Sequence, residues 1–278
     1  MKQLTLIALL FFTMSYGQHI NLMTYNIRLD NPNDGENAWP NRKDVLVNQI
    51  LFYQPDVIGT QEGLEHQIHY LDEKLESYKY VGIARADVKE NGKGEYSAVF
   101  YNANKLKDLK SGTFWLSDTP NKPSRGWDAS LNRICTYILL QDKKSGKKFW
   151  VFNTHFDHKG IIARQRSAEL IREKIMEINK EKLAVFLMGD FNLTPDESPI
   201  KYITKKLNDS KLVSQQLPFG PDETFNGFKV CDERDRRIDY IFVSQKNIIV
   251  KKYGVLANVK KLKYPSDHFP VYISAEIE

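Results

Sequence analysis

Eight short runs of β-branched and aromatic residues recur along the chain, each bounded by turn-forming residues. Runs of this composition and length are typical of β-strands. Apolar residues also recur at spacings of three and four over residues 46–53 and 168–178, as on one face of a helix. The predicted strands cover residues 20–27, 56–61, 96–101, 133–140, 149–155, 183–190, 237–243 and 270–277.

Helices therefore separate some consecutive strands but not others. A helical connection favours parallel pairing, whereas strands joined without a helix favour antiparallel pairing. The pattern predicts an α/β fold with two stacked mixed sheets and helices on the outside.

Several predicted strands end in polar side chains that can take part in chemistry. Asn26, Glu62, His155 and Asp190 each follow an apolar run. Functional residues are commonly placed at strand ends and in the loops beyond them, because the strands hold them rigidly. Each residue alone is weak evidence for a site, since a single Asn, Glu or His at a strand end more often has a structural role.

The first 17 residues combine Lys2 with an apolar run over residues 4–14, followed by small residues. This pattern is typical of a cleaved secretion signal. A membrane anchor is the alternative, but a spanning helix needs roughly 20 apolar residues. We therefore expect a signal peptide over residues 1–17 and a secreted or periplasmic protein without a transmembrane segment. Residues 18–278 contain no internal repeat or low-complexity linker and are expected to form one catalytic domain that acts as a monomer.

The charge and cysteine content exclude some classes of protein. The formal net charge is +5 and falls by one when Lys2 leaves with the signal. The lysines are scattered, which is more typical of solvated loops than of a groove for nucleic acid. Cys135 and Cys231 are the two cysteines, and their pairing cannot be inferred. Cys135 lies in an apolar run and is expected to be a buried thiol, so disulfides do not hold this fold.

Taken together, five oxygen-bearing residues form a ligand set for a hard divalent cation. Mg²⁺ and Mn²⁺ prefer carboxylate and amide oxygens and retain water. Zinc fits less well, because the histidines lack the close spacing of zinc motifs. The candidate ligands and phosphate-facing residues are Asn26, Glu62, Asp190, Asn192 and Asp267.

Six motifs occur in an order that closely resembles the endonuclease/exonuclease/phosphatase superfamily. They are MTYNIR, IGTQEGLEHQ, NTHFDH, MGDFNLTPDE, RRIDYIFVS and YPSDHFPV, and the resemblance extends from residue 20 to residue 277. It implies a four-layered α/β sandwich with a metal at the carboxyl ends of the two sheets. It also implies hydrolysis of a phosphoester by in-line attack of water.

The resemblance assigns metal and phosphate roles to single positions. Glu62 matches the principal metal carboxylate, and Asp267 a second one. Asn26 matches the amide that helps to hold metal or phosphate. Asp190 and Asn192 match the pair that orients the attacking water and a phosphate oxygen, with Asp190 also near the metal.

The remaining assignments concern proton transfer and substrate binding. His268 matches the catalytic histidine, with Asp239 as the carboxylate that fixes its tautomer. His155 matches the second histidine of the deoxyribonuclease-like and sphingomyelinase-like branches, and Glu95 falls where its carboxylate partner would lie. Arg133 resembles a phosphate-contacting arginine. Whether Asp190 or His268 takes the water proton stays open.

One departure concerns the abasic-site endonucleases of this superfamily. They carry an acidic residue where this chain has Arg28 and a tyrosine in place of His155. Abasic-site repair is therefore not expected.

The segment 112–133 is rich in tryptophan and proline for a connection between strands. Trp115 and Trp127 are predicted to form a substrate wall on which a sugar or base stacks, and Trp39 could join them. The alternative is that Trp115 is core and the rest is a packed loop.

Three functions follow, in order of preference. The first is a secreted phosphoesterase for a small, lipid-linked or glycan-linked substrate, because a nuclease that tracks a phosphate backbone usually concentrates Lys and Arg on one face. The second is a secreted nuclease, which would make nucleic acid the partner. The third is a catalytically silent binding protein on the same fold.

Overall fold

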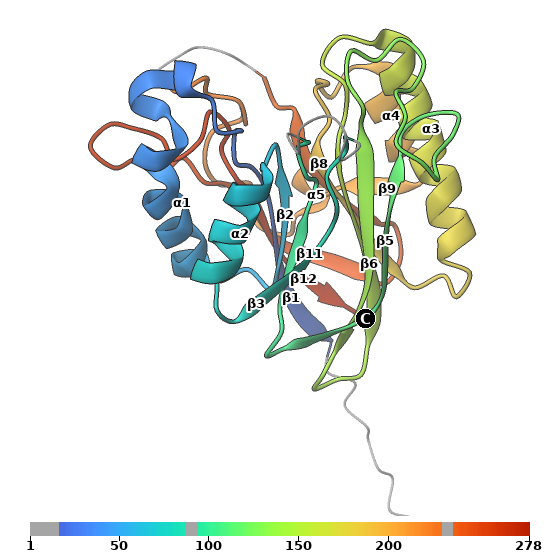
Figure 1. The fold of residues 1–278 in the computed structure, drawn as a ribbon. Helices are drawn as coiled ribbons and strands as arrows, with labels where there is room; N and C mark the ends of the chain where they lie inside the picture. The colour runs from blue at the N-terminus through green and yellow to red at the C-terminus, as the bar shows by residue number, and fades with distance from the viewer. Residues whose placement is uncertain (1–16, 87–93, 230–235) are drawn as a thin grey trace, which may run out of the picture.

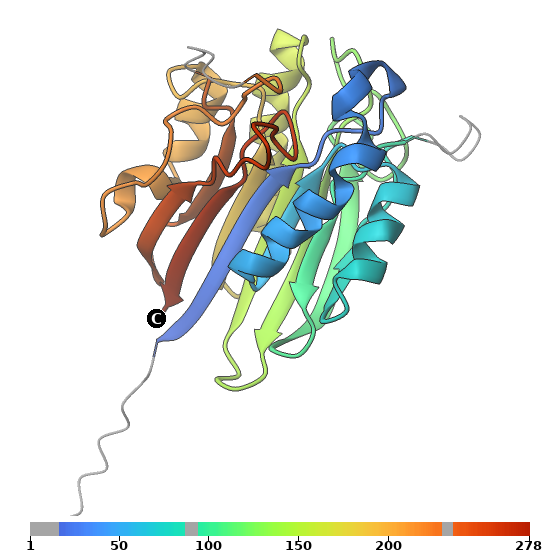
Figure 2. The same ribbon diagram turned by 90° about the vertical axis from the view of Figure 1, so that its left-hand side faces the viewer.

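The computed structural model describes residues 17–86, 94–229 and 236–278, which form two stacked β-sheets between outer helices (Figures 1 and 2). The first sheet has the order β11 (Ile248–Val255), β12 (Val271–Ile277), β1 (Gln18–Asn26), β2 (Val57–Gln61), β4 (Val99–Asn102) and β3 (Tyr78–Val81). The second has the order β5 (Leu106–Trp115), β6 (Ile134–Asp142), β7 (Lys148–His155), β8 (Ala184–Asp190), β10 (Asp239–Ser244) and β9 (Leu207–Asp209). The helices are η1 (Pro32–Asn37, a 3₁₀ helix), α1 (Trp39–Tyr53), α2 (Glu65–Lys74), α3 (Ile161–Ile178), α4 (Ser198–Thr204) and α5 (Ser210–Val213).

The alternation of side chains along the central strands produces four layers. In β1, Leu22 joins the apolar cluster between the two sheets, whereas Met23 packs under α1 and α2. In β8, Phe186 faces the other sheet, and Leu187 packs under α3 and α4. Successive residues of a strand point to opposite faces, so a central strand that is covered on both sides has apolar residues on both faces. The four-layered sandwich of mixed sheets predicted from the sequence is confirmed.

All eight predicted strands and both predicted helices are present, although the helices begin earlier, at Trp39 and Ile161. Trp39, which was a candidate for the substrate wall, is instead part of the core, with 3% of its surface exposed. Four strands, β3, β5, β9 and β11, and the helices α2, α4 and α5 were not predicted from the sequence.

Strand register brings the polar strand ends to one edge of the sandwich. β1 and β2 are parallel, and Asn26 pairs with Gln61, the residue before Glu62. β7 and β8 are also parallel, with His155 beside Asp190. The antiparallel strand β10 begins at the same edge and places Asp239 opposite Asp190. Residues that lie far apart in the sequence therefore meet at the carboxyl ends of four neighbouring strands.

A buried polar link joins the two sheets just below this edge. The Asn153 Nδ2 in β7 donates to the carbonyl oxygens of Thr60 and Ala98 in the opposite sheet, at 2.9 and 2.8 Å. Its Oδ1 accepts from Gln61 Nε2 at 2.6 Å. A Cβ at Gly59 would lie 2.7 Å from the Asn153 Oδ1, so only glycine allows the link here. Because buried polar groups are costly unless paired, this network fixes one relative position of the sheets.

Within the described ranges, no helix is both long and apolar enough to cross a membrane. Cys135 is buried in β6, and burial raises the pKa of its thiol well above the ordinary value. Cys231 and residues 1–16 of the predicted signal lie outside the described residues.

Candidate active site

The strand ends surround a cavity of about 780 Å³. Asp190, Asn192, His155, Glu62, Asp267 and His268 line it, together with Glu95 and Arg133. The sequence named all eight of these residues, and the structure brings them to one cavity.

Asn26 connects two carboxylates that line the cavity, those of Glu62 and Asp190. Its Nδ2 donates to Glu62 Oε1 at 3.1 Å and to Asp190 Oδ2 at 3.0 Å. The same nitrogen lies 3.4 Å from His268 Nε2. Burial alone would raise the pKa of Glu62, but the charge of His268 and the Asn26 hydrogen bond lower it. One amide thus holds two carboxylates from different sheets close together, with Glu62 ionised.

Arg28 is a residue of the cavity that the sequence analysis did not assign to the site. Its Nε lies 2.9 Å from Asp34 and 3.7 Å from Asp267 Oδ2, and its NH1 lies 3.9 Å from Glu62 Oε2. The guanidinium therefore balances charge among three carboxylates. The only signal in the sequence was its position two residues after Asn26.

Three cavity residues have a left-handed backbone conformation. Arg28, Glu62 and Asn192 have φ values of 55°, 64° and 51°. Each follows within two residues of a strand end, where the chain turns sharply into a loop. Such conformations are uncommon for residues other than glycine and are frequent at functional sites.

His268 is held by two carboxylates. Its Nδ1 lies 2.9 Å from Asp239 Oδ2, and its Nε2 lies 3.8 Å from Asp190 Oδ2. Burial alone would lower the pKa of His268, but Asp239 and then Asp190 raise it to about 10. Burial and the nearby Asp239 raise the pKa of Asp190 to about 7. The cationic ring can therefore donate a proton from Nε2, and Asp190 can accept one near neutral pH.

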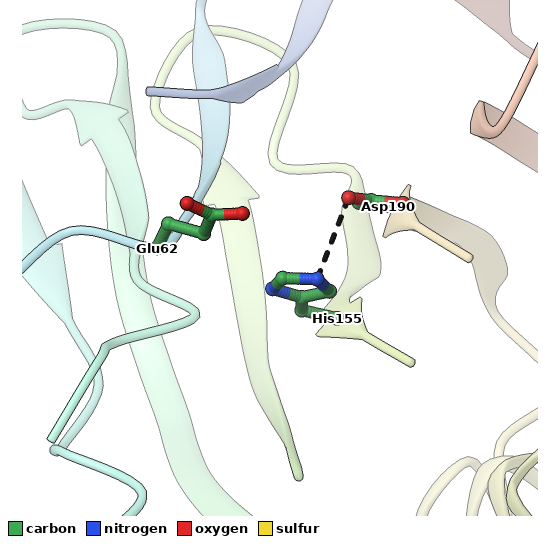
Figure 3. Close-up of side chains that lie close together, drawn as sticks. All are labelled: Glu62, His155 and Asp190. Atoms are coloured by element: carbon green, nitrogen blue, oxygen red, sulfur yellow. Dashed lines mark ion pairs between the residues drawn. The ribbon is translucent and has the colours of Figure 1, made fainter. Parts of the chain in front are cut away.

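His155 lies between Asp190 and Glu62 (Figure 3). Its Nε2 is 3.4 Å from Asp190 Oδ2 and 3.1 Å from Asn192 Nδ2. Its Nδ1 lies 4.0 Å from Glu95 Oε2. Burial, then the charges of Arg133 and Arg85, lower the pKa of His155 well below the ordinary value. The ring is consequently neutral, in contrast to His268.

Glu95 lies closer to Arg85, which was not singled out in the sequence, than to His155. Arg85 NH2 donates to Glu95 Oε1 at 2.5 Å. Burial raises the pKa of Glu95, and the positive charge of Arg85 opposes this shift. The backbone carbonyl of Arg85 also accepts from Trp115 Nε1 at 2.8 Å. No motif marked Arg85 in the sequence.

Arg133 lies in the cavity wall, immediately before β6, and is 4% exposed. Its guanidinium contacts Asp157 and His158, which belong to the NTHFDH motif but were not assigned roles. The signal for them in the sequence was two polar residues that begin two positions after His155, the last residue of the strand.

The two tryptophans are not among the described residues that line this cavity. Trp115 ends β5 and is 5% exposed, so its placement favours the core alternative. Trp127 is partly exposed, and its Nε1 donates to Asp118 Oδ1 at 3.0 Å. It lines a separate groove along α3. The apolar pattern of the segment did not distinguish packing from ligand contact.

The donor atoms fit a hard divalent cation. Glu62, His155 and Asp190 offer ligand atoms within 4.8 Å of one another, and so do Asp190, Asp239 and His268. Carboxylate oxygens predominate, which is the chemistry preferred by Mg²⁺ and Mn²⁺. A set of carboxylates, an amide and two histidines at the carboxyl ends of an α/β sandwich defines a metal-dependent hydrolase of phosphoesters.

Comparison with known proteins agrees with this class. Residues 23–268 match the Endonuclease/Exonuclease/phosphatase family, and the chain belongs to it. A mannosyl-6-phosphatase from Bacteroides thetaiotaomicron is 37% identical, with a TM-score of 0.87 over 92% of this chain and 99% of that one. The L388 protein of Acanthamoeba polyphaga mimivirus is 30% identical over 86% of this chain and 92% of its own length. Human nocturnin is 26% identical over 83% of this chain, which spans only 56% of nocturnin.

Proposed function

We propose that this protein is an exported, metal-dependent phosphoesterase that acts on a compact substrate, with sugar phosphates as the first class to test. The observation that carries the proposal is a cavity of about 780 Å³ lined by carboxylates and by a buried arginine. A cavity of this size suits a ligand that can be largely enclosed. The similarity to a mannosyl-6-phosphatase supports the same substrate class.

The carboxylates of the cavity would hold the cation. Glu62 and Asp267 supply carboxylate oxygens, with Asp190 beside them, and Asn26 positions Glu62 and Asp190 through its Nδ2. When bound, Mg²⁺ or Mn²⁺ neutralises charge on the phosphoryl oxygens.

Asp190 and His268 would divide the proton transfers. The raised pKa of Asp190 suits it to accept a proton from the attacking water. The cationic His268, oriented by Asp239, donates a hydrogen bond from Nε2 to the developing negative charge. Asn192 and the neutral His155 lie 3.1 Å apart and would stabilise the phosphorane and the leaving oxygen.

Export is the second part of the proposal. It rests on the charged, apolar and small-residue sequence of residues 1–17, which leaves residues 18–278 as the catalytic unit. An extracellular or periplasmic location would place the enzyme among substrates released outside the cell.

The test is a substrate panel with Mg²⁺ or Mn²⁺. Mannose 6-phosphate, glucose 6-phosphate, sphingomyelin, phosphoinositides, plasmid DNA and RNA would be compared by kcat/KM, with Asp190→Asn as the control for contaminating enzymes. We expect a compact phosphoester to be the best substrate. Preferential cleavage of DNA or RNA would replace the proposal with the nuclease alternative, and a complete lack of turnover would favour the binding protein.

A further inference from the structure

Arg133 has one nitrogen without a partner in the cavity wall. The side chain is 4% exposed. Its Nε lies 3.4 Å from Asp157 Oδ2, and its NH2 lies 3.1 Å from His158 Nδ1. Its NH1 is buried and makes no hydrogen bond with any residue in the described part of the chain. Buried guanidinium groups are normally fully paired, so this nitrogen indicates an acceptor that a ligand supplies.

The contact with Arg133 fixes the tautomer of His158. A guanidinium only donates hydrogen bonds, so the Nδ1 of His158 must accept. In the neutral ring the proton then sits on Nε2. Burial and the charge of Arg133 lower the pKa of His158, which keeps the ring neutral. His158 lines the same cavity, and its Nε2–H is a second donor beside Arg133.

Asp157 holds the pair in place. Its carboxylate is 1% exposed and accepts from Ser130 Oγ at 2.9 Å and from the backbone nitrogen of Gly160 at 2.8 Å. It also accepts from the backbone nitrogen of Lys159. The loop that carries His158 and the segment that leads to Arg133 are therefore tied to one buried group, and the two donors are preorganised.

We propose that Arg133 and His158 form an anion subsite for the third terminal oxygen of a phosphomonoester, and that His158 is a specificity-determining residue for monoesters over diesters. The inference rests on the proposed function and deepens it. A phosphomonoester carries three terminal oxygens and a charge of about −1.5 to −2 at neutral pH. A diester has two terminal oxygens and a single charge. Its second ester group would face the subsite and leave Arg133 NH1 without an anionic acceptor.

The first test compares p-nitrophenyl phosphate with bis(p-nitrophenyl) phosphate in the Mg²⁺-loaded protein. We expect the wild-type protein to prefer the monoester. His158→Leu should lower kcat/KM for the monoester by about tenfold or more, the effect of losing a hydrogen bond to a charged group. Turnover of the diester should change far less, so His158→Leu should lose the preference for the monoester over the diester.

Two further variants separate a lost hydrogen bond from a disturbed fold. His158→Gln should retain the preference, because its amide oxygen can accept from Arg133 while its nitrogen donates to the substrate. His69→Leu makes the same substitution on the exposed face of α2 and should leave both rates unchanged. Thermal melts of each variant accompany the kinetics. A wild-type preference for the diester, or an equal loss on both substrates in His158→Leu, would overturn the inference.

A binding measurement keeps this inference distinct from the proposed function. Orthophosphate and dimethyl phosphate would be titrated calorimetrically into the Mg²⁺-loaded protein. We expect orthophosphate to bind more tightly and to lose about tenfold in affinity in His158→Leu. This result would support the subsite even if no sugar phosphate were hydrolysed. Equal affinity of the wild-type protein for the two anions, or no loss in His158→Leu, would refute the subsite whatever the natural substrate is.

Discussion

Asp157→Asn tests how Arg133 and His158 are held in the cavity wall. The wild-type carboxylate accepts hydrogen bonds from Ser130, from three backbone nitrogens and from Arg133. Asparagine keeps the size of the side chain but removes its charge. Its amide nitrogen, which is itself a donor, would face donors that now contact the carboxylate. The buried guanidinium of Arg133 then loses its only acidic partner among the described residues.

Removing one partner of a buried ion pair costs roughly 3 to 5 kcal/mol. Domains of this class are stable by only about 5 to 15 kcal/mol. For a chain of this size the loss corresponds to a fall in Tm on the order of 10 °C. Asp142→Asn is the matched control, because its Oδ1 accepts from two backbone nitrogens in the turn after β6 and asparagine can do the same. That variant should melt close to the wild type.

The loss of stability in Asp157→Asn should also depend on pH. Burial alone would raise the pKa of Asp157, but hydrogen bonds from the backbone of Gly160 and Lys159 and from Ser130 hold it well below its usual value. The unfolded chain therefore binds more protons than the folded one, and the stabilisation is present above about pH 4 and lost as the pH falls further. The difference in Tm between wild type and Asp157→Asn should therefore narrow steadily as the pH falls below about 4. A pH-independent difference, or a variant as stable as the wild type at pH 7, would refute the reasoning.

Four other outcomes are expected. Chelation should abolish turnover and Mg²⁺ or Mn²⁺ should restore it; full activity of a stripped, chelated sample would contradict the metal assignment. His268→Ala should lower kcat by about 10²-fold or more, and Asp239→Asn somewhat less, in steady-state kinetics; an undiminished rate in the alanine variant would exclude a catalytic role. Mass spectrometry of the natural protein should find an amino terminus near Gln18, and retention of the first residues would contradict export. Trp115→Ala should lose roughly 3 to 5 kcal/mol in denaturant unfolding, with the partly exposed Trp127→Ala much less affected; equal losses would argue against a core role specific to Trp115.

The parts of the fold that the sequence predicted are those that are apolar on both faces. β1, β7 and β8 are covered by a sheet on one side and by helices on the other, so each has apolar residues at consecutive positions. β5 is different, because it lies at the edge of its sheet and exposes residues 107–111. Its sequence is therefore mostly polar, and the segment resembled a connection.

The candidate site divides in a similar way. Residues with a short sequence motif, such as Asp190 and His268, could be located because their motif order resembles that of a family. Arg28 and Arg85 could not, because their roles depend on which carboxylate each guanidinium reaches after folding. Trp115, in contrast, was predicted to contact substrate but lies in the core. A tryptophan is both apolar and able to stack on a ligand, and only its burial in β5 distinguishes the two.

Both sheets contribute residues to the cavity. Glu62 and Arg28 follow strands of the first sheet, whereas Asp190, Arg133 and His158 end or flank strands of the second. A phosphate that contacts both a Glu62-bound cation and the Arg133 guanidinium would therefore span the junction between the sheets. The Asn153 link lies just below this junction and sets the spacing of the two sides. Because Asn153 is buried and both ends of its amide are paired, the cavity does not depend on a ligand to bring its two halves together, which is the preorganisation that stabilisation of a charged transition state requires.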